Sequence, residues 1–219
     1  MNTLAEIPLW KLILLGGPMM LPLMICSVFA LTTIIEKLIY FHNILKPIAK
    51  VKETVFDLIQ KNKIPEAISF CDTHPSLAAK ILKSGLIKFG STKEEMKKSM
   101  EEAGLFEIPK IEHHLGILST TAHISPLLGF LATAIGMFSC FHTVQVRFAS
   151  LMPITPADFT AGLGQALIAT IAGLAIAIVS FIAYNYFISR AHYIVFEIER
   201  MSVELINFIY QMTDNEYLA

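Results

Sequence analysis

The sequence is poor in charged residues and in cysteine. Asp, Glu, Lys and Arg make up only 16% of its 219 residues, against roughly 25% in an average soluble domain. The 17 basic and 18 acidic residues nearly cancel, which excludes a basic nucleic-acid-binding domain and an acidic disordered tail. Cys26, Cys71 and Cys140 lie far apart, without a CxxC pair. Neither a zinc ribbon nor a disulfide scaffold is therefore predicted.

Motifs typical of enzymes and of β-structure are missing as well. We find no phosphate-binding loop, no nucleophile–base pair and no pair of catalytic carboxylates. No segment alternates apolar and polar residues with the period of a strand. The sequence therefore predicts an all-α chain that is not an enzyme and needs no cofactor or metal.

Apolar residues are abundant, at 54% of the total and a mean hydropathy of +0.60. Three stretches carry no formal charge, residues 12–35, 113–146 and 159–189, and they are 24, 34 and 31 residues long. About 20 apolar residues in a helix cross a hydrocarbon core ~30 Å thick, and a helical hairpin would need about twice as many. The stretches thus predict three transmembrane helices in a lipid bilayer, at residues 18–36, 113–146 and 159–189, and a soluble fold is disfavoured.

The first stretch is predicted to be a retained helix and not a cleaved signal peptide. No basic region precedes it beyond Lys11, and it ends in Glu36 and Lys37 without a small-residue cleavage site. Gly16-Gly17-Pro18 interrupts this stretch. Residues 1–17 are therefore expected to form a separate helix at the periplasmic membrane interface.

Basic residues are distributed unevenly around the spans. Residues 37–112 hold 13 of the 17 basic residues, whereas residues 147–158 hold one. Cytoplasmic segments next to transmembrane helices are enriched in Lys and Arg. Residues 37–112 are therefore predicted to be a cytoplasmic helical region and residues 147–158 a periplasmic loop. The N-terminus is then periplasmic, and residues 190–219 form a cytoplasmic C-terminal helix.

Helical periodicity within residues 37–112 predicts short helices joined by turns. They are expected at residues 44–61, 65–70 and 77–89. Ser91-Thr92-Lys93-Glu94 has the pattern of a capping box. This pattern predicts Ser91 as the N-cap of a further helix, which ends near Pro109.

The second and third spans are predicted to continue beyond the membrane. The second stretch, of 34 residues, is about 51 Å long as a helix, well beyond the ~30 Å core. After the third span, apolar residues recur at spacings of 4, 3, 4, 3 and 4, at Ile194, Ile198, Met201, Leu205, Phe208 and Met212. Such a seam predicts packing against a neighbour in the assembly. We therefore expect two of the three spans to extend into a cytoplasmic helical bundle.

Small and hydroxyl side chains line one face of each of the last two spans. They are Gly129, Ala132, Thr133, Gly136 and Cys140 on the second, and Gly162, Ala166, Thr170, Gly173, Ala177 and Ser180 on the third. Two interpretations are open. Such stripes mark close helix packing in membranes, or Thr133 and Thr170, each near the middle of its span, line an ion pathway. A Thr hydroxyl can also bond to the backbone one turn back, so the hydroxyls alone do not decide between them.

Two segments resemble signatures of the ExbB/TolQ/MotA ion-channel family. Ser125–Phe138 (SPLLGFLATAIGMF) resembles the second-helix signature. Gln165–Leu174, followed by Ala183–Phe187, resembles the third-helix signature. The segment from Glu66 to Glu101 also looks like the family's cytoplasmic helices, and three spans favour the ExbB/TolQ branch.

The resemblance implies an ion-driven motor subunit of the bacterial inner membrane. Such subunits form a homopentamer around the single-span helices of two ExbD/TolR-like partners. They use the proton or sodium motive force to drive work in the periplasm or at the outer membrane. The interiors of the three spans hold no Asp, Glu, Lys or Arg, so the titrating group that a proton relay needs is expected on the partner. A non-conducting membrane scaffold of the same fold is the alternative.

The resemblance also implies roles for individual residues. Thr133 and Thr170 match the family's pore-facing threonines, and Tyr184 with Asn185 matches its Tyr–Asn pair near the cytoplasmic end. Contacts to the pore or the partner are further implied for Gln165, Pro126, Gly129, Gly136 and Gly173. Gln165 stands where many members carry Glu, and an amide cannot exchange a proton near neutral pH. It also lies about 140° around the helix from Thr170, so the two side chains cannot both point into one pore.

Overall fold

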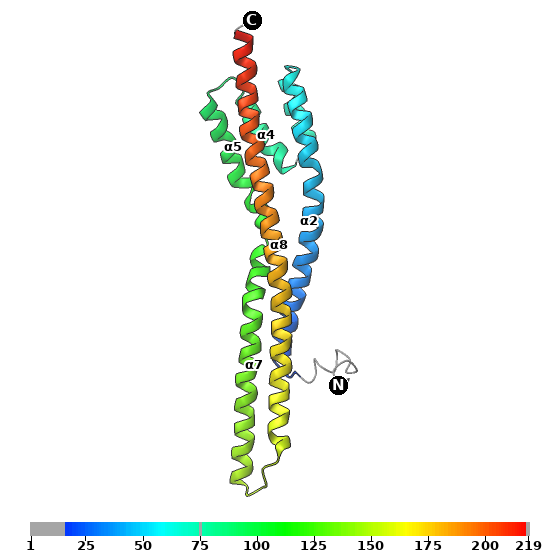
Figure 1. The fold of residues 1–219 in the computed structure, drawn as a ribbon, viewed down its shortest axis with the longest axis vertical. Helices are drawn as coiled ribbons and strands as arrows, with labels where there is room; N and C mark the ends of the chain where they lie inside the picture. Colours follow the sequence, from blue (N-terminus) through cyan, green and yellow to red (C-terminus); the bar gives the residue numbers. More distant parts are fainter. Residues whose placement is uncertain (1–15, 75, 218–219) are drawn as a thin grey trace. The chain divides into compact units, whose positions relative to one another are not determined.

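The computed structural model describes residues 16–74 and 76–217, and it is helical nearly throughout (Figure 1). The helices are α2 (Met20–Gln60), α3 (Ile64–Thr73), α4 (Leu77–Ile87), α5 (Lys93–Glu107), α6 (Pro109–Glu112), α7 (Leu115–Ala149) and α8 (Pro156–Tyr217). The described ranges contain no strand, which confirms the all-α prediction. The helix predicted at residues 1–17 falls outside the described residues except for its last two.

Three helices are long and apolar enough to cross a membrane, as the charge-free stretches predicted. The candidate spans are Met20–Ile44, Leu115–Ala149 and Pro156–Met212, with 25, 35 and 57 residues. The chain is therefore an all-α membrane protein.

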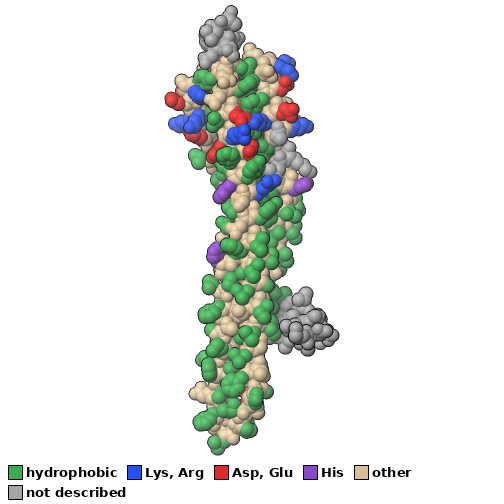
Figure 2. Space-filling view, in the orientation of Figure 1, with side chains coloured by type: hydrophobic (Ala, Val, Ile, Leu, Met, Phe, Trp, Pro, Cys, Tyr) green, Lys and Arg blue, Asp and Glu red, His purple; other side chains and the backbone are tan. Residues whose placement is uncertain are grey.

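The chain divides into two compact units. We call residues 1–35 and 114–185 the apolar unit, and residues 36–113 and 186–219 the charged unit. Figure 2 shows Lys, Arg, Asp and Glu side chains gathered over the charged unit and hydrophobic side chains covering the apolar unit. Because the described part of the apolar unit includes only two formal charges, its surface suits the hydrocarbon core of a bilayer.

The helices that continue from the apolar into the charged unit are α2 and α8, and not α7 as the length of the second stretch suggested. The α7 helix begins at Leu115, directly after His114, whose left-handed backbone (φ 70°) separates it from α6. The helix predicted at residues 44–61 is instead the uninterrupted continuation of the first span. Apolar periodicity located the helical segments but did not show which of them are joined.

The apolar seam of the C-terminal helix is buried within the chain itself. Ile194, Ile198, Met201 and Leu205 are at most 1% exposed. The Phe208 ring lies 5.5 Å from the ring of Phe56 on α2. The seam was expected to pack against a neighbour in the assembly, and this expectation is wrong for these four residues, because α8 buries them within its own charged unit.

Caps and ion pairs fix the short helices of the charged unit. The N-cap of α5 is Thr92, whose hydroxyl accepts from the Glu95 amide at 3.3 Å, and not Ser91 as predicted. Glu107, at the end of α5, accepts from Lys110 at 2.6 Å and from Lys80 at 3.1 Å. The Lys110 hydrogen bond, followed by that from Lys80, holds the pKa of the Glu107 carboxyl below its usual value.

Candidate functional site

Helices α7 and α8 pack so closely in the apolar unit that the glycines at their contact, Gly129, Gly136, Gly162 and Gly173, are needed for steric reasons. A Cβ atom on Gly173 would lie 2.5 Å from the Ser125 carbonyl oxygen, and one on Gly136 would lie 2.9 Å from the Gly162 carbonyl oxygen. On Gly129 it would lie 3.1 Å from the Thr170 Cα. In a membrane, such contact between backbones supplies the van der Waals attraction that holds helices together. The stripes of small residues therefore form the α7–α8 contact.

The two mid-span threonines meet at this contact. Their Oγ1 atoms lie 3.5 Å apart. The Thr170 hydroxyl is 2.9 Å from the Gly129 carbonyl oxygen across the contact and 3.0 Å from the Ala166 carbonyl oxygen of its own helix. The Thr133 hydroxyl is 2.8 Å from the Phe130 carbonyl oxygen and 3.2 Å from that of Gly129. The expectation that the two hydroxyls lie at one depth is thus met, and both can donate to the same carbonyl.

This arrangement gives each hydroxyl a choice of acceptors. A hydroxyl has one proton and two lone pairs, so each threonine can donate to one backbone carbonyl and still accept from a water molecule or bind a cation through its free lone pairs. Both side chains are half-buried and thus remain partly accessible. The pair can therefore serve as a polar contact for an ion in an otherwise apolar wall, although it cannot itself titrate near neutral pH.

The apolar unit has little other charge. Its formal charges in the described ranges, Arg147 and Asp158, pair at 2.8 Å where the chain passes from α7 to α8. The Asp158 carboxylate also accepts from the Thr155 amide at 2.8 Å and from the Thr155 hydroxyl at 2.9 Å. These bonds fix the first turn of α8 and leave no carboxylate beside the threonines. Throughout residues 16–74 and 76–217, no group of three or more His, Cys, Asp or Glu side chains could hold a metal.

Gln165 lies against the chain's own N-terminal segment. Gly17 has a positive φ of 71°, and a Cβ atom there would overlap the Gln165 Nε2 atom. Only glycine fits at this position, both for the backbone conformation and for the contact. Thr170 faces Gly129 on α7, so the two α8 side chains point to different neighbours, as their angular separation predicted.

The remaining predicted site residues lie at other levels of the unit. Pro126 is inside α7 and half-buried. Tyr184 is half-buried and Asn185 exposed, and on the α8 helix they are about 20 Å from Thr170 at 1.5 Å per residue. The structure therefore brings Thr133, Thr170 and the glycines together and leaves the Tyr–Asn pair apart from them.

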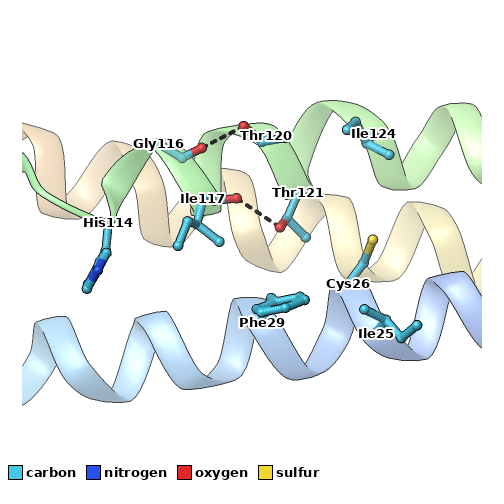
Figure 3. Close-up of a pocket in the computed structure, with 9 residues that line it drawn as sticks. All are labelled: Ile25, Cys26, Phe29, His114, Gly116, Ile117, Thr120, Thr121 and Ile124. Carbon is cyan, nitrogen blue, oxygen red and sulfur yellow. Dashed lines mark hydrogen bonds between the residues drawn. The ribbon is translucent and has the colours of Figure 1, made fainter.

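Two features of the apolar unit were not predicted from the sequence. Ser125 and Ser180 are fully buried, and their hydroxyls have no hydrogen-bond partner. A groove of about 640 Å³ also opens between α2 and α7, lined by Ile25, Cys26, Phe29, His114, Gly116, Ile117, Thr120, Thr121 and Ile124 (Figure 3). Its two Thr hydroxyls donate back to Gly116 and Ile117 carbonyls at 2.7 and 2.9 Å. Nothing in the sequence marked the groove, since its residues come from distant segments.

Comparison with known proteins identifies similar chains. The family model of the MotA/TolQ/ExbB proton channel family matches residues 73–200, which include both threonines. The putative biopolymer transport protein ExbB-like 3 of Synechocystis sp. is 28% identical over 78% of this chain and 81% of its own length. The biopolymer transport protein exbB1 of Vibrio cholerae is 29% identical over 74% and 71%. The Tol-Pal system protein TolQ of Pseudomonas aeruginosa is 34% identical, over 47% of this chain and 42% of its own length.

Proposed function

Because the chain belongs to the MotA/TolQ/ExbB proton channel family, and is thus a subunit of a membrane transport or energy-transduction system, we propose that it is an ExbB/TolQ-like motor subunit. It conducts protons or Na⁺ through the bacterial inner membrane and turns the ion-motive force into work in the periplasm or at the outer membrane. The observation that carries this proposal is the Thr133–Thr170 pair, two hydroxyls 3.5 Å apart in the middle of two apolar spans.

The titrating group of the proposed pathway belongs to a partner. A proton relay in a membrane normally uses an ionisable side chain, and the two formal charges of the described apolar unit are tied to each other beside Thr155. An ExbD/TolR-like dimer of single-span subunits, with a carboxylate in its helix, supplies the missing group. The large exposed apolar side chains of the spans, such as Phe130 and Phe138 at 73% and 72% exposure, support further contacts with lipid and with other copies in a homopentamer.

The proposed orientation has the N-terminus in the periplasm and the C-terminus in the cytoplasm. It rests on the concentration of lysines in residues 37–112, all of which belong to the charged unit. Cytoplasmic flanks of transmembrane helices are enriched in Lys and Arg. The charged unit is therefore the cytoplasmic one.

A second candidate is a membrane scaffold of the same fold that conducts no ions. It is favoured by one observation: each threonine hydroxyl already has a backbone carbonyl acceptor within the chain, at 2.8 Å for Thr133 and 2.9 Å for Thr170. A hydroxyl satisfied in this way needs no ion to complete its bonding. Conduction and packing must therefore be separated by experiment.

The test replaces each hydroxyl with a methyl group of similar size. The chain is produced together with a single-span partner subunit, reconstituted into liposomes, and assayed for ion flux driven by a membrane potential. We expect Thr170→Val to abolish flux and Thr133→Val to reduce it, with the mass of the complex unchanged. Thr120→Val is the matched control, because the hydroxyl of this exposed α7 residue, among the contacts described, bonds only to the Gly116 carbonyl of the same helix. Full flux in both Thr170→Val and Thr133→Val would remove the threonines from the ion pathway, and no flux through the unaltered complex would favour the scaffold.

A further inference from the structure

Two buried serine hydroxyls in the apolar unit have no hydrogen-bond partner. Ser125 on α7 and Ser180 on α8 are both 0% exposed, and within the described residues theirs are the buried side-chain polar atoms left unpaired. Ser125 lies one turn from Gly129, and its carbonyl oxygen contacts Gly173. Ser180 lies two turns beyond Gly173 on the same buried face. A buried hydroxyl without a partner is costly, so a molecule that satisfies each of them is expected.

A second polar group is left open beside Ser125. Pro126 has no N–H and cannot donate to the Ala122 carbonyl, the acceptor that residue 126 would normally bond. Side chains on a helix point back toward its N-terminus, and Ala122 lies on the turn that precedes Ser125. Ala122 is itself buried. One turn of α7 thus offers an unpaired hydroxyl and a carbonyl that lacks its usual N–H donor, two groups that an ordered water can bond.

We propose that Ser125 binds a water molecule together with the Ala122 carbonyl, and that Ser180 binds another. These two waters extend the row of polar groups that begins at the Thr133–Thr170 pair, and we call this row the polar track. The register places them in order, because Gly129 lies opposite Thr170, and Ser125 opposite Gly173. Ser180 follows Thr170 by about 15 Å along α8, toward the end at which this helix enters the charged unit. Gly173, opposite Ser125, and Ser180 are seven residues apart on α8, about 10 Å, so the two waters are separate polar contacts for an ion and do not exchange a proton directly. The conducting role rests on the proposed function, whereas water binding does not.

Thiol accessibility tests water binding independently of conduction. In the full-length chain assembled with its partner in membranes, the native cysteines are replaced by Ala, and Ser125→Cys and Ser180→Cys are made singly. The probe is 2-aminoethyl methanethiosulfonate, which reacts with thiolate. Ala169→Cys is the matched control, because Ala169 is also 0% exposed but lies in an apolar cluster with Met20, Leu23 and Ala132.

We expect the cysteines at 125 and 180 to react at least about tenfold faster than the one at 169, because a hydrated thiol ionises more readily than one in a dry contact. Equal rates at all three positions would overturn the water sites. Expression level and complex mass confirm that each variant assembles.

The conducting role is tested by Ser125→Ala. We expect ion flux to fall about fivefold, the factor that corresponds to one ordinary hydrogen bond, while Ser139→Ala, at an exposed position of α7, leaves it unchanged. Full flux in Ser125→Ala would overturn the extension of the track. Reactive thiols combined with no ion flux through the unaltered complex would refute the proposed function and leave the water sites standing. Unreactive thiols with flux lost in Thr170→Val would refute the water sites alone.

Discussion

The contact between α7 and α8 can be tested most directly at Gly173. In Gly173→Ala the new Cβ atom would lie 2.5 Å from the Ser125 carbonyl oxygen and 3.3 Å from the Gly129 Cα. Both neighbours belong to backbone, which cannot rotate away, so the helices must separate by roughly 1 Å to reach normal contact distance. Overpacking of this kind costs about 1–3 kcal/mol. It also lengthens the 2.9 Å bond from Thr170 to the Gly129 carbonyl.

Gly164→Ala is the matched control on the same helix. A Cβ atom there meets no heavy atom within 4 Å, so alanine brings only its better helix propensity, up to about 1 kcal/mol. Because Gly173→Ala gains the same propensity, we expect its free energy of unfolding to be lower than that of Gly164→Ala by the overpacking cost alone, about 1–3 kcal/mol. The assay is reversible unfolding of the micelle-solubilised protein by titration with a denaturing detergent. Equal stability of the two variants would show that α7 and α8 do not touch at Gly173.

Three further predictions follow from burial, charge and orientation. Ile198→Asp should lower the free energy of unfolding by about 3 kcal/mol or more, since it buries a carboxylate at a 1% exposed position. Val203→Asp, at 52% exposure, should change it little, and similar losses in the two variants would contradict the burial of the seam within the chain. The lowered pKa of Glu107 contributes stability that is present above its unfolded pKa and lost as the pH falls through its folded pKa. In Glu107→Gln the free energy of unfolding should therefore fall less steeply at acid pH, and an unchanged pH profile would contradict the lowered pKa. In a background without native cysteines, Ser91→Cys should react only with label added from the cytoplasmic side and Thr155→Cys only from outside, and the reverse pattern would overturn the orientation.

The sequence by itself determined the class of the protein. The charge-free stretches 12–35, 113–146 and 159–189 predict three spans because a charged side chain is costly in hydrocarbon, and three candidate spans are found. The family resemblance of Ser125–Phe138 and of the third-helix segments is also confirmed. Helical spacing put Thr133 and Thr170 at the middle of their spans and separated Thr170 from Gln165 by angle, since 3.6 residues per turn fixes the direction of side chains on one helix.

Only the tertiary structure decided which helices and which side chains meet. Whether Ile198 faces another copy or its own chain depends on the neighbours that α8 finds, and a heptad pattern is the same in both cases. The shared Gly129 carbonyl, the contact of Gln165 with Gly17, and the unpaired hydroxyl of Ser125 all depend on the register and rotation of one helix against another. Spacing along a chain fixes the face of a helix, but the partner of that face is set by packing between segments far apart in the sequence.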